Sequence, residues 1–380
     1  MTTALILSGG GARAAYQVGV MRAVYEIMTF EQQPFDIICG TSAGAINAAY
    51  MTAYAHRPRQ GIVRLHHVWR KLSAQDVYDT SWSSFLSSIS KIITCVALGT
   101  SYNTPAAILD NSPLYDLLSN WLDFDSIHAN LRNGRLRNLC ITAMNYSTGE
   151  SIAFFEGMPV DPWQRLHRRG YAAEIKLEHI LASSAIPILF PPQAIDGDFY
   201  GDGALRQLNP LSPALHLGAD RLFIVGVSSN KKGRYSSDRG TAAPSVAQVA
   251  GHLLNREFID NLEADIEQAE VINALLDDCA LQDNNAPAVN KVDFMVITPS
   301  VAINDIAARY MKQQPSSMRL LFRILGAQER GAGASFASYL LFDGGFCQEL
   351  SDTGYRDGMD NRESIRNFFS RAAAATQTGS

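Results

Sequence analysis

The chain has 380 residues, of which 47% are hydrophobic and 18% charged, with a formal net charge of −5. This length can bury one large core or two ordinary ones, and the charge gives no electrostatic reason to expect nucleic-acid binding. The five cysteines are scattered and form no Cys-x-x-Cys pair. They predict reduced thiols and therefore a cytoplasmic protein.

The hydrophobic stretches are too short for export or for crossing a bilayer. The first apolar run is only Ala4 to Leu7, and glycines begin at Gly9, so we expect no signal peptide. The stretch Phe85 to Gly99 contains Lys91 and several serines, and it falls short of the ~20 apolar residues that span a membrane. We expect no transmembrane helix, while peripheral contact with a membrane surface stays open.

The N-terminal quarter alternates between short apolar runs and helical patterns. The expected order is strand Thr3 to Gly9, helix Ala12 to Met28, strand Phe35 to Gly40 and helix Ser42 to Ala55. Short links between such elements favour a parallel sheet covered by helices on both faces. The predicted fold class is therefore α/β, with three layers and a mainly parallel central sheet.

The rest of the chain adds further strands and helices. Residues 80–120 mix serines, apolar residues and two prolines, and we interpret them as a cap or insertion. The later predicted elements are a β-hairpin over 136–155, a helix from Leu177 ended by Pro187, a turn at 199–205, a strand over 221–229, a helix over 245–276, a last strand over 292–299 and short helices after Ser300.

The first motif that can carry chemistry is the glycine run Gly9, Gly10 and Gly11 between a strand and a helix. Backbone N–H groups at such a helix start suit a phosphate or an oxyanion. The spacing Gly9-x-Gly11-x-x-Ala14 also fits a dinucleotide-binding loop, and a tight turn that needs glycine is the structural alternative.

The second motif is Gly40-Thr41-Ser42-Ala43-Gly44, the only G-x-S-x-G in the chain. It follows an apolar strand and opens a helix, which is the context of a nucleophile elbow. The alternative is that Ser42 only caps the helix.

The third motif is Asp202-Gly203-Ala204. Asp-Gly is ordinary turn chemistry, but a serine nucleophile needs a base from elsewhere in the chain. None of the eight histidines has a recognisable catalytic context. A Ser-His-Asp triad that uses His216 or His252 nevertheless stays open.

Together, the three motifs resemble the patatin-like phospholipase family, which has a G-G-G-x-[RK]-G loop, then G-x-S-x-G, then D-G-[GA]. Here they are "GGGARA", "GTSAG" and "DGA". The stretches 182–192 and 110–118 also resemble family segments, and 257–273 with 338–350 resemble a C-terminal extension of bacterial members.

The resemblance implies a lipid acyl hydrolase, a carboxylic ester hydrolase of the phospholipase A, lysophospholipase or lipid esterase type. Ser42 and Asp202 would form a catalytic dyad, and the loop of Gly9, Gly10 and Gly11 an oxyanion hole. Arg13 would hold that loop or favour a phosphate-bearing head group. No metal or cofactor is expected. The resemblance also implies that the chain is divided into a catalytic domain over 1–230, a long helix and last strand over 231–300, and a helical extension over 301–380.

One departure from the family pattern is Ala14, where most members have glycine. Alanine is strained at positive φ but harmless if it starts the helix, and the helical pattern favours the second case. Two stretches, Phe85 to Leu98 and Ile186 to Phe190, are candidates to line an acyl channel.

Two other functions remain as alternatives. One is a nicotinamide-dependent oxidoreductase, with Glu31 in the place of the ribose-binding acid 20 residues after Gly11. The other is a pseudoenzyme that binds lipid without turnover. The expected substrate is a lipid or lysolipid, and the sequence leaves its head group and the oligomeric state open.

Overall fold

The computed structural model describes residues 1–84, 86–87, 90, 107–228, 246–255, 260–282, 291–325, 327 and 332–377. Within them the strands form one ten-stranded sheet, in the order β10-β9-β1-β2-β3-β4-β6-β5, with β8 paired to β3 and β7 to β8. The strands are β1 (Thr3–Leu7), β2 (Ile37–Thr41), β3 (Asn138–Asn145), β4 (Ser151–Gly157), β5 (Trp163–Arg165), β6 (Arg168–Ala172), β7 (Gln193–Ile195), β8 (Asp198–Asp202), β9 (Arg221–Val225) and β10 (Asp293–Ile297).

The five strands from β10 to β3 are parallel, and the antiparallel pairs of the described strands lie beyond them, among β3, β4, β5, β6, β7 and β8. Each of the strands β1, β2 and β9 has five residues, and all of them are buried, as expected for parallel strands covered on both faces. The expectation of a mainly parallel α/β fold is confirmed.

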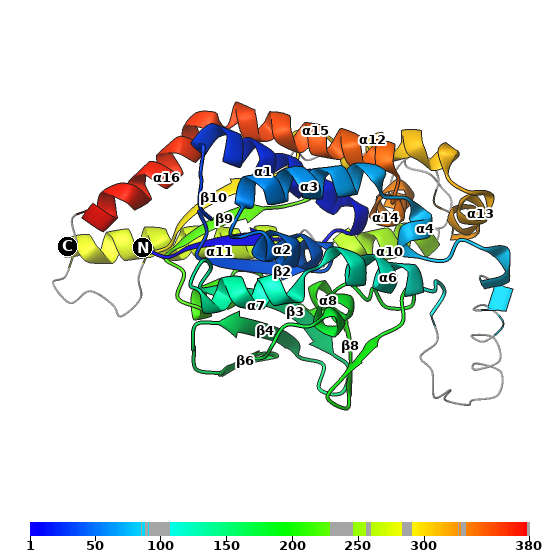
Figure 1. The fold of residues 1–380 in the computed structure, drawn as a ribbon, viewed down its shortest axis with the longest axis horizontal. Helices are drawn as coiled ribbons and strands as arrows, with labels where there is room; N and C mark the ends of the chain where they lie inside the picture. The colour runs from blue at the N-terminus through cyan, green and yellow to red at the C-terminus, as the bar shows by residue number, and fades with distance from the viewer. Residues whose placement is uncertain are drawn as a thin grey trace.

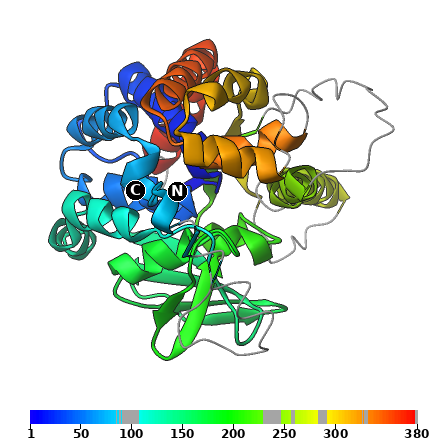
Figure 2. The ribbon, with the colours of Figure 1, turned by 90° about the vertical axis from the view of Figure 1, so that its right-hand side faces the viewer.

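Helices cover both faces of this sheet (Figures 1 and 2). The helices before β9 are α1 (Ala15–Met28), α2 (Ala43–Ala53), α3 (Pro58–Lys71), α4 (Ala74–Val77), α6 (Ser112–Trp121), α7 (Phe124–Arg132), α8 (Leu177–Ser183) and α9 (Ser212–His216). Those after β9 are α10 (Val246–Asn255), α11 (Asn261–Gln282), α12 (Ile303–Tyr310), α13 (Ser316–Leu325), α14 (Ala332–Leu340), α15 (Gly344–Asp360) and α16 (Arg362–Gln377). Short 3-10 helices are η1 (Gly11–Ala14), η2 (Gly203–Arg206) and η4 (Met311–Gln313).

Each face of the sheet has its own hydrophobic core. Leu5 and Leu7 of β1 pack with α1, α2, α3 and the C-terminal helices, whereas Ala4 and Ile6 pack with α9 and Leu262 of α11. This alternation follows from the two-residue period of a strand. The first of these cores extends from Leu5 to Phe369, so the C-terminal helices belong to the same hydrophobic core as the sheet.

The longest of the C-terminal helices, α15, lies along α1 in Figure 1. Two glycines allow the two backbones to approach: a Cβ on Gly19 would lie 1.9 Å from the Ser351 carbonyl oxygen, and one on Gly354 would lie 2.2 Å from that of Tyr16. Only glycine fits at such distances. The division of the chain into three parts stays a prediction.

Several expected elements differ from the structure. The stretch predicted as a turn at 199–205 contains strand β8 and helix η2, and the hairpin of β5 and β6 was not predicted. The predicted helix over 245–276 is described as α10 and α11, with 256–259 outside the described residues. Two of the helices after Ser300 are long, α15 with 17 residues and α16 with 16.

Within the described residues, no helix is both long and apolar enough to cross a bilayer. Most of the stretch Phe85 to Gly99 lies outside those residues, and so does most of the candidate channel lining at Phe85 to Leu98.

Candidate active site

Ser42 lies in the sharp turn between β2 and α2, with φ 55° and ψ −131°. This positive φ is unfavourable for serine and marks a strained backbone. A Cβ on Gly40 would lie 2.5 Å from the Gly44 carbonyl oxygen, and one on Gly44 would lie 2.3 Å from that of Leu7. The two glycines of the motif are therefore required by the close packing of the strand, the turn and the helix.

The Ser42 hydroxyl does not cap α2, although Ser42 stands at the N-cap position. Its Oγ donates a hydrogen bond to Oδ2 of Asp202 at 2.6 Å. The helix-cap alternative for this side chain is therefore not what the structure contains.

The register of the sheet explains how two residues far apart in sequence meet. Thr41, at the end of β2, is opposite Thr142 of β3. The next residue of β3, Ala143, is opposite Asp202 of β8. Strand β8 thus continues beside β3 where β2 ends, and this brings Asp202 next to Ser42.

Asp202 is fully buried, and its carboxylate accepts two hydrogen bonds. Oδ2 accepts from Ser42 Oγ, and Oδ1 accepts from the backbone N–H of Ala204 at 2.9 Å. Burial raises the pKa of this carboxyl to about 7, and the two hydrogen bonds oppose the increase. A carboxyl with this pKa can accept and return a proton near neutral pH.

Hydrogen bonds from buried side chains fix the backbone of the turn that contains Ser42. The backbone N–H of Ser42 donates to Ser183 Oγ at 2.8 Å, and Ser183 Oγ donates to the Thr142 carbonyl at 2.6 Å. Thr41 Oγ1 donates to Gln207 Oε1 at 2.7 Å, and the Gln207 amide donates to Thr142 Oγ1 at 3.2 Å. The sequence analysis did not identify Ser183 or Gln207 as part of the site. The only hints in the sequence are that Ser183 lies in the family-like segment 182–192 and that Gln207 follows Asp202 by a few residues.

The glycine loop approaches the same place from the end of β1. Gly11 has φ +53°, and a Cβ there would lie 2.1 Å from the Tyr339 carbonyl oxygen; one on Gly10 would lie 2.5 Å from a methyl of Val227. Among the described residues, no hydrogen bond is recorded from the backbone N–H of Gly9, Gly10 or Gly11. Ala14 has φ −64° and ψ −13°, so alanine starts the helix without strain.

Arg13 points from this loop into the C-terminal helices and is 3% exposed. Its guanidinium donates to the Oγ of Ser338 and Ser335 and to Asn304 Oδ1, and it lies 4.1 Å from the ring centre of Tyr339. Of the two roles expected for Arg13, these contacts correspond to holding the loop, because they occupy the guanidinium away from the pocket described next.

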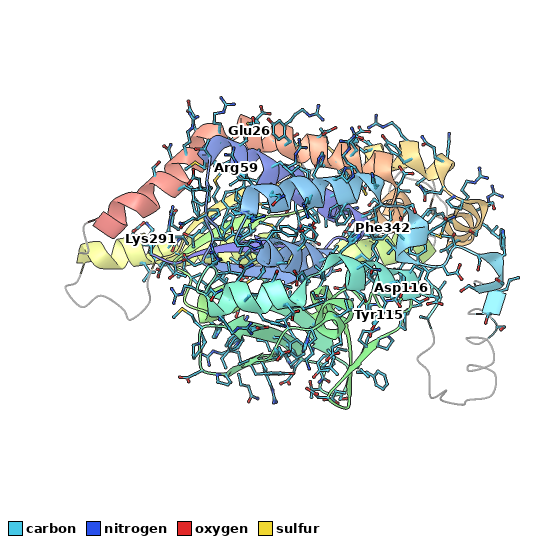
Figure 3. All side chains as sticks on the ribbon, in the orientation of Figure 1. Glu26, Arg59, Tyr115, Asp116, Lys291 and Phe342 are labelled. Atoms are coloured by element: carbon cyan, nitrogen blue, oxygen red, sulfur yellow. The ribbon has the colours of Figure 1, made fainter. Side chains whose placement is uncertain are left out.

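Ser42 borders an apolar pocket. The empty volume of this pocket is about 530 Å³, including the open solvent at its mouth. Gly11, Ser42 and Ser184 are on its wall together with apolar side chains of several elements, among them Trp69, Leu114, Leu117, Ile186, Phe190 and Phe342. Phe342 is labelled in Figure 3, and so are Tyr115 and Asp116 of α6, the helix that contributes Leu114 and Leu117 to the pocket wall. Ile186 and Phe190, from the stretch suggested for an acyl channel, are thus on the wall of this pocket, and the channel itself stays a prediction.

The histidines of the proposed triad lie elsewhere. His216 Nδ1 contacts Ser212 in α9, and its ring stacks on Trp163 at 4.8 Å, while His252 is exposed on α10. Among the described residues, none of the recorded hydrogen bonds joins a histidine to Ser42.

The oxidoreductase alternative finds little support in the geometry. Glu31 is exposed in the loop between α1 and β2 rather than at a strand end. The described part of the chain contains no group of three or more His, Cys, Asp or Glu side chains that could hold a metal ion.

The fold and site define an α/β protein with a serine and a carboxylate paired at the end of its parallel strands. Residues 5–215 match the family described as patatin-like phospholipase. The chain belongs to the patatin-like phospholipase family.

The chain is similar to parts of two known phospholipases. The calcium-independent phospholipase A2-gamma of Oryctolagus cuniculus is 27% identical over 241 residues, which are 62% of this chain and 28% of that protein. The cGAMP-activated phospholipase of Escherichia coli (strain TW11681) is 26% identical over 220 residues, 54% of this chain and 52% of that protein. The chain thus spans about half of the bacterial relative and a third or less of the mammalian ones.

Among solved structures, human GIVD cytosolic phospholipase A2 in complex with methyl gamma-linolenyl fluorophosphonate has a TM-score of 0.41 at 13% identity, covering 97% of this chain and 59% of that one. VipD from Legionella pneumophila has a TM-score of 0.34 at 13% identity, covering 96% and 67%.

Proposed function

We propose that this protein hydrolyses acyl esters of lipids with Ser42 as nucleophile and Asp202 as its base. The observation that carries the proposal is the 2.6 Å hydrogen bond between Oγ of Ser42, a residue on the wall of an apolar pocket, and Oδ2 of the buried Asp202. An apolar pocket suits an acyl chain, and the family is named for phospholipase activity.

In the first half of the reaction, Ser42 Oγ attacks the ester carbonyl carbon while its proton passes to Asp202. The tetrahedral oxyanion accepts hydrogen bonds from backbone N–H groups of Gly9, Gly10 and Gly11, at the start of a helix. As the carbon–oxygen bond of the ester breaks, Asp202 gives the proton to the departing alcohol. The acyl group is then bound to Ser42.

In the second half, water attacks the acyl-Ser42 carbonyl and Asp202 accepts its proton. The Ser42–acyl bond breaks, the proton returns to Ser42 Oγ, and a fatty acid leaves through the pocket. The raised pKa of Asp202 suits both transfers, because an unperturbed carboxylate is a weak base at neutral pH.

The test is covalent labelling with a fluorescent alkyl fluorophosphonate, which reacts with an activated serine. Wild-type protein is expected to label, Ser42→Ala to show no labelling, and Asp202→Asn to label at least about a hundredfold more slowly. Ser184→Ala is a matched control, because Ser184 is on the pocket wall and its hydroxyl donates to the Ile180 carbonyl of its own helix.

Fatty-acid release from phospholipid, lysophospholipid and glyceride substrates, measured by mass spectrometry, then identifies the substrate class. Folded wild-type protein that neither labels nor releases fatty acid would refute the hydrolase proposal. Retained lipid binding in that case would support the pseudoenzyme alternative.

A further inference from the structure

The C-terminal part of the chain contributes one side chain to the pocket of Ser42. The family match ends at residue 215, and among the described residues on the pocket wall only Phe342 lies beyond it. Phe342 is buried in the short link between α14 and α15, and Figure 3 shows its position. This part of the wall therefore comes from outside the region that matches the family.

Aromatic side chains support the ring of Phe342. The ring lies nearly parallel to that of Trp69, with ring centres 6.5 Å apart, and meets the ring of Tyr78 edge-on at 6.2 Å. Tyr78 also contacts Phe190, at 6.2 Å between ring centres. Trp69 and Phe190 are on the pocket wall with Phe342, whereas Tyr78 connects them from outside it. The indole N–H of Trp69 donates to Asn47 Oδ1 at 2.9 Å, so this ring is fixed as well.

The backbone on both sides of Phe342 is held in place. Before it, the carbonyl of Leu340 accepts hydrogen bonds from the Tyr78 hydroxyl at 2.7 Å and from the backbone N–H of Phe342 at 2.9 Å. After it, a Cβ on Gly344 would lie 2.4 Å from the Arg70 carbonyl oxygen, so the link runs directly against the end of α3. Moving the Phe342 ring out of the pocket would therefore break the Tyr78 hydrogen bond or shift the start of α15.

The pocket wall selects a ligand by shape rather than by polar recognition. Apart from Gly11, Ser42 and Ser184, its residues are apolar. In such a pocket one methylene group more or less changes the preference between two ligands by about 10–200-fold. A ring that is supported from behind cannot give way without loss of packing. A rigid aromatic side chain on this wall can thus decide which acyl chains fit.

We propose that Phe342 limits the length of the acyl chain that the pocket of Ser42 accepts. The inference rests on the proposed hydrolase function, because it places the acyl chain of the substrate in this pocket. A chain that ends before the Phe342 ring binds without strain, whereas a longer chain has to displace the ring from Trp69 and Tyr78. The C-terminal helices, through this one residue, then set the chain-length specificity of a site whose nucleophile and base lie in the matched region.

The experiment compares rates of Ser42 labelling by alkyl fluorophosphonates with butyl, octyl, dodecyl and hexadecyl chains, all in the same non-ionic detergent. The alkyl chain on phosphorus takes the place of the acyl chain. In wild-type protein the rate is expected to fall at the longer chains. Phe342→Ala leaves room for further methylene groups, and it is expected to raise the ratio of the hexadecyl rate to the butyl rate at least about tenfold.

Phe346→Ala is the matched control for this ratio. It also removes a buried phenyl ring from the C-terminal part, but Phe346 packs on Tyr310 and is not among the residues on the pocket wall. A loss of stability alone lowers all labelling rates together, so this variant is expected to keep the wild-type ratio. If Phe342→Ala fails to fold, Phe342→Leu replaces it, with a severalfold increase of the ratio expected.

The outcomes separate this inference from the function on which it rests. Wild-type protein that labels, with a chain-length profile that the folded Phe342 variant shares, would overturn the role of Phe342 and leave the hydrolase proposal standing. An equal change of the ratio in Phe346→Ala would overturn it too. Folded wild-type protein that labels with none of the four compounds would overturn the hydrolase proposal, and this inference with it.

Discussion

The proton affinity of one buried carboxyl sets the expected pH dependence of the site. Below a pKa of about 7, Asp202 is protonated and cannot accept the Ser42 proton. The fluorophosphonate labelling rate is therefore expected to rise about tenfold per pH unit up to about 7 and then to level off. Rates measured from about pH 5 to about pH 9 check this. A rate already constant at the acidic end of that range would contradict the assignment of Asp202 as the base.

The same carboxyl affects stability, because its pKa is higher in the folded chain than its ordinary value of 3.8. The folded state then binds the proton more tightly than the unfolded state. Stability from this group is fully present below pH 3.8 and decreases as the pH rises towards 7. Asp202→Asn removes the buried charge, so its free energy of unfolding should exceed that of wild type at about pH 8. Urea unfolding of both proteins at about pH 5 and about pH 8 measures the difference, and a gain that is equal at both values would exclude this cause.

Ser183 is expected to position the nucleophile through its two hydrogen bonds. Ser183→Ala leaves the Ser42 N–H and the Thr142 carbonyl without these partners. We expect a loss of ~1–3 kcal/mol in the free energy of unfolding and slower labelling of Ser42. The labelling pH profile should keep its midpoint, since Asp202 is unchanged. Ser184→Ala is the control, and an equal effect of both variants on labelling would refute a positioning role specific to Ser183.

At the scale of elements, the sequence predicted the β–α–β–α order around the glycine loop and the elbow because those segments have strong periodicity and short links. Asp202 was singled out, but as part of a turn rather than as the end of β8. Its pairing with β3 depends on the register Ala143 to Asp202, which no local pattern contains. The hairpin of β5 and β6 escaped prediction because β5 has only three residues.

The start of α1 gives a prediction about the family's usual glycine at position 14. Ala14 is fully buried with φ −64°, so its backbone is unstrained. Ala14→Gly should lower the free energy of unfolding by about 1 kcal/mol, through greater freedom of the unfolded chain, and should leave the labelling rate unchanged. Urea unfolding and fluorophosphonate labelling check both parts. Faster labelling of the variant would mean that alanine does disturb the loop.

Gly11 is the contrasting position in the same loop. Its φ is +53°, and a Cβ added there would lie 2.1 Å from the Tyr339 carbonyl oxygen, so alanine has no room. Gly11→Ala is therefore expected to move the loop or α14, and to slow labelling much more than Ala14→Gly. The pair of variants separates the conformational requirement of the loop from its composition.

At the scale of the whole molecule, the C-terminal helices α12 to α16 contribute side chains to the same hydrophobic core as Leu5 and Leu7 of β1. Helix α15 packs on α1, and Arg13 ties the glycine loop to α12 and α14 through Asn304, Ser335 and Ser338. A change on α15 is therefore expected to reach the glycine loop, although the family match ends at residue 215.

Gly354→Leu tests this dependence, because any Cβ at Gly354 meets the Tyr16 carbonyl at 2.2 Å and must push α15 away from α1. We expect a loss of at least ~3 kcal/mol in the free energy of unfolding, as for severe overpacking, together with loss of labelling. Arg356→Leu places the same side chain at an exposed position of α15, where the wild-type side chain donates only to Thr353 of the same helix, and it should leave both nearly unchanged. If Gly354→Leu folds and labels like Arg356→Leu, the glycine loop does not depend on the α1–α15 contact, and residues 301–380 would be a separable extension after all.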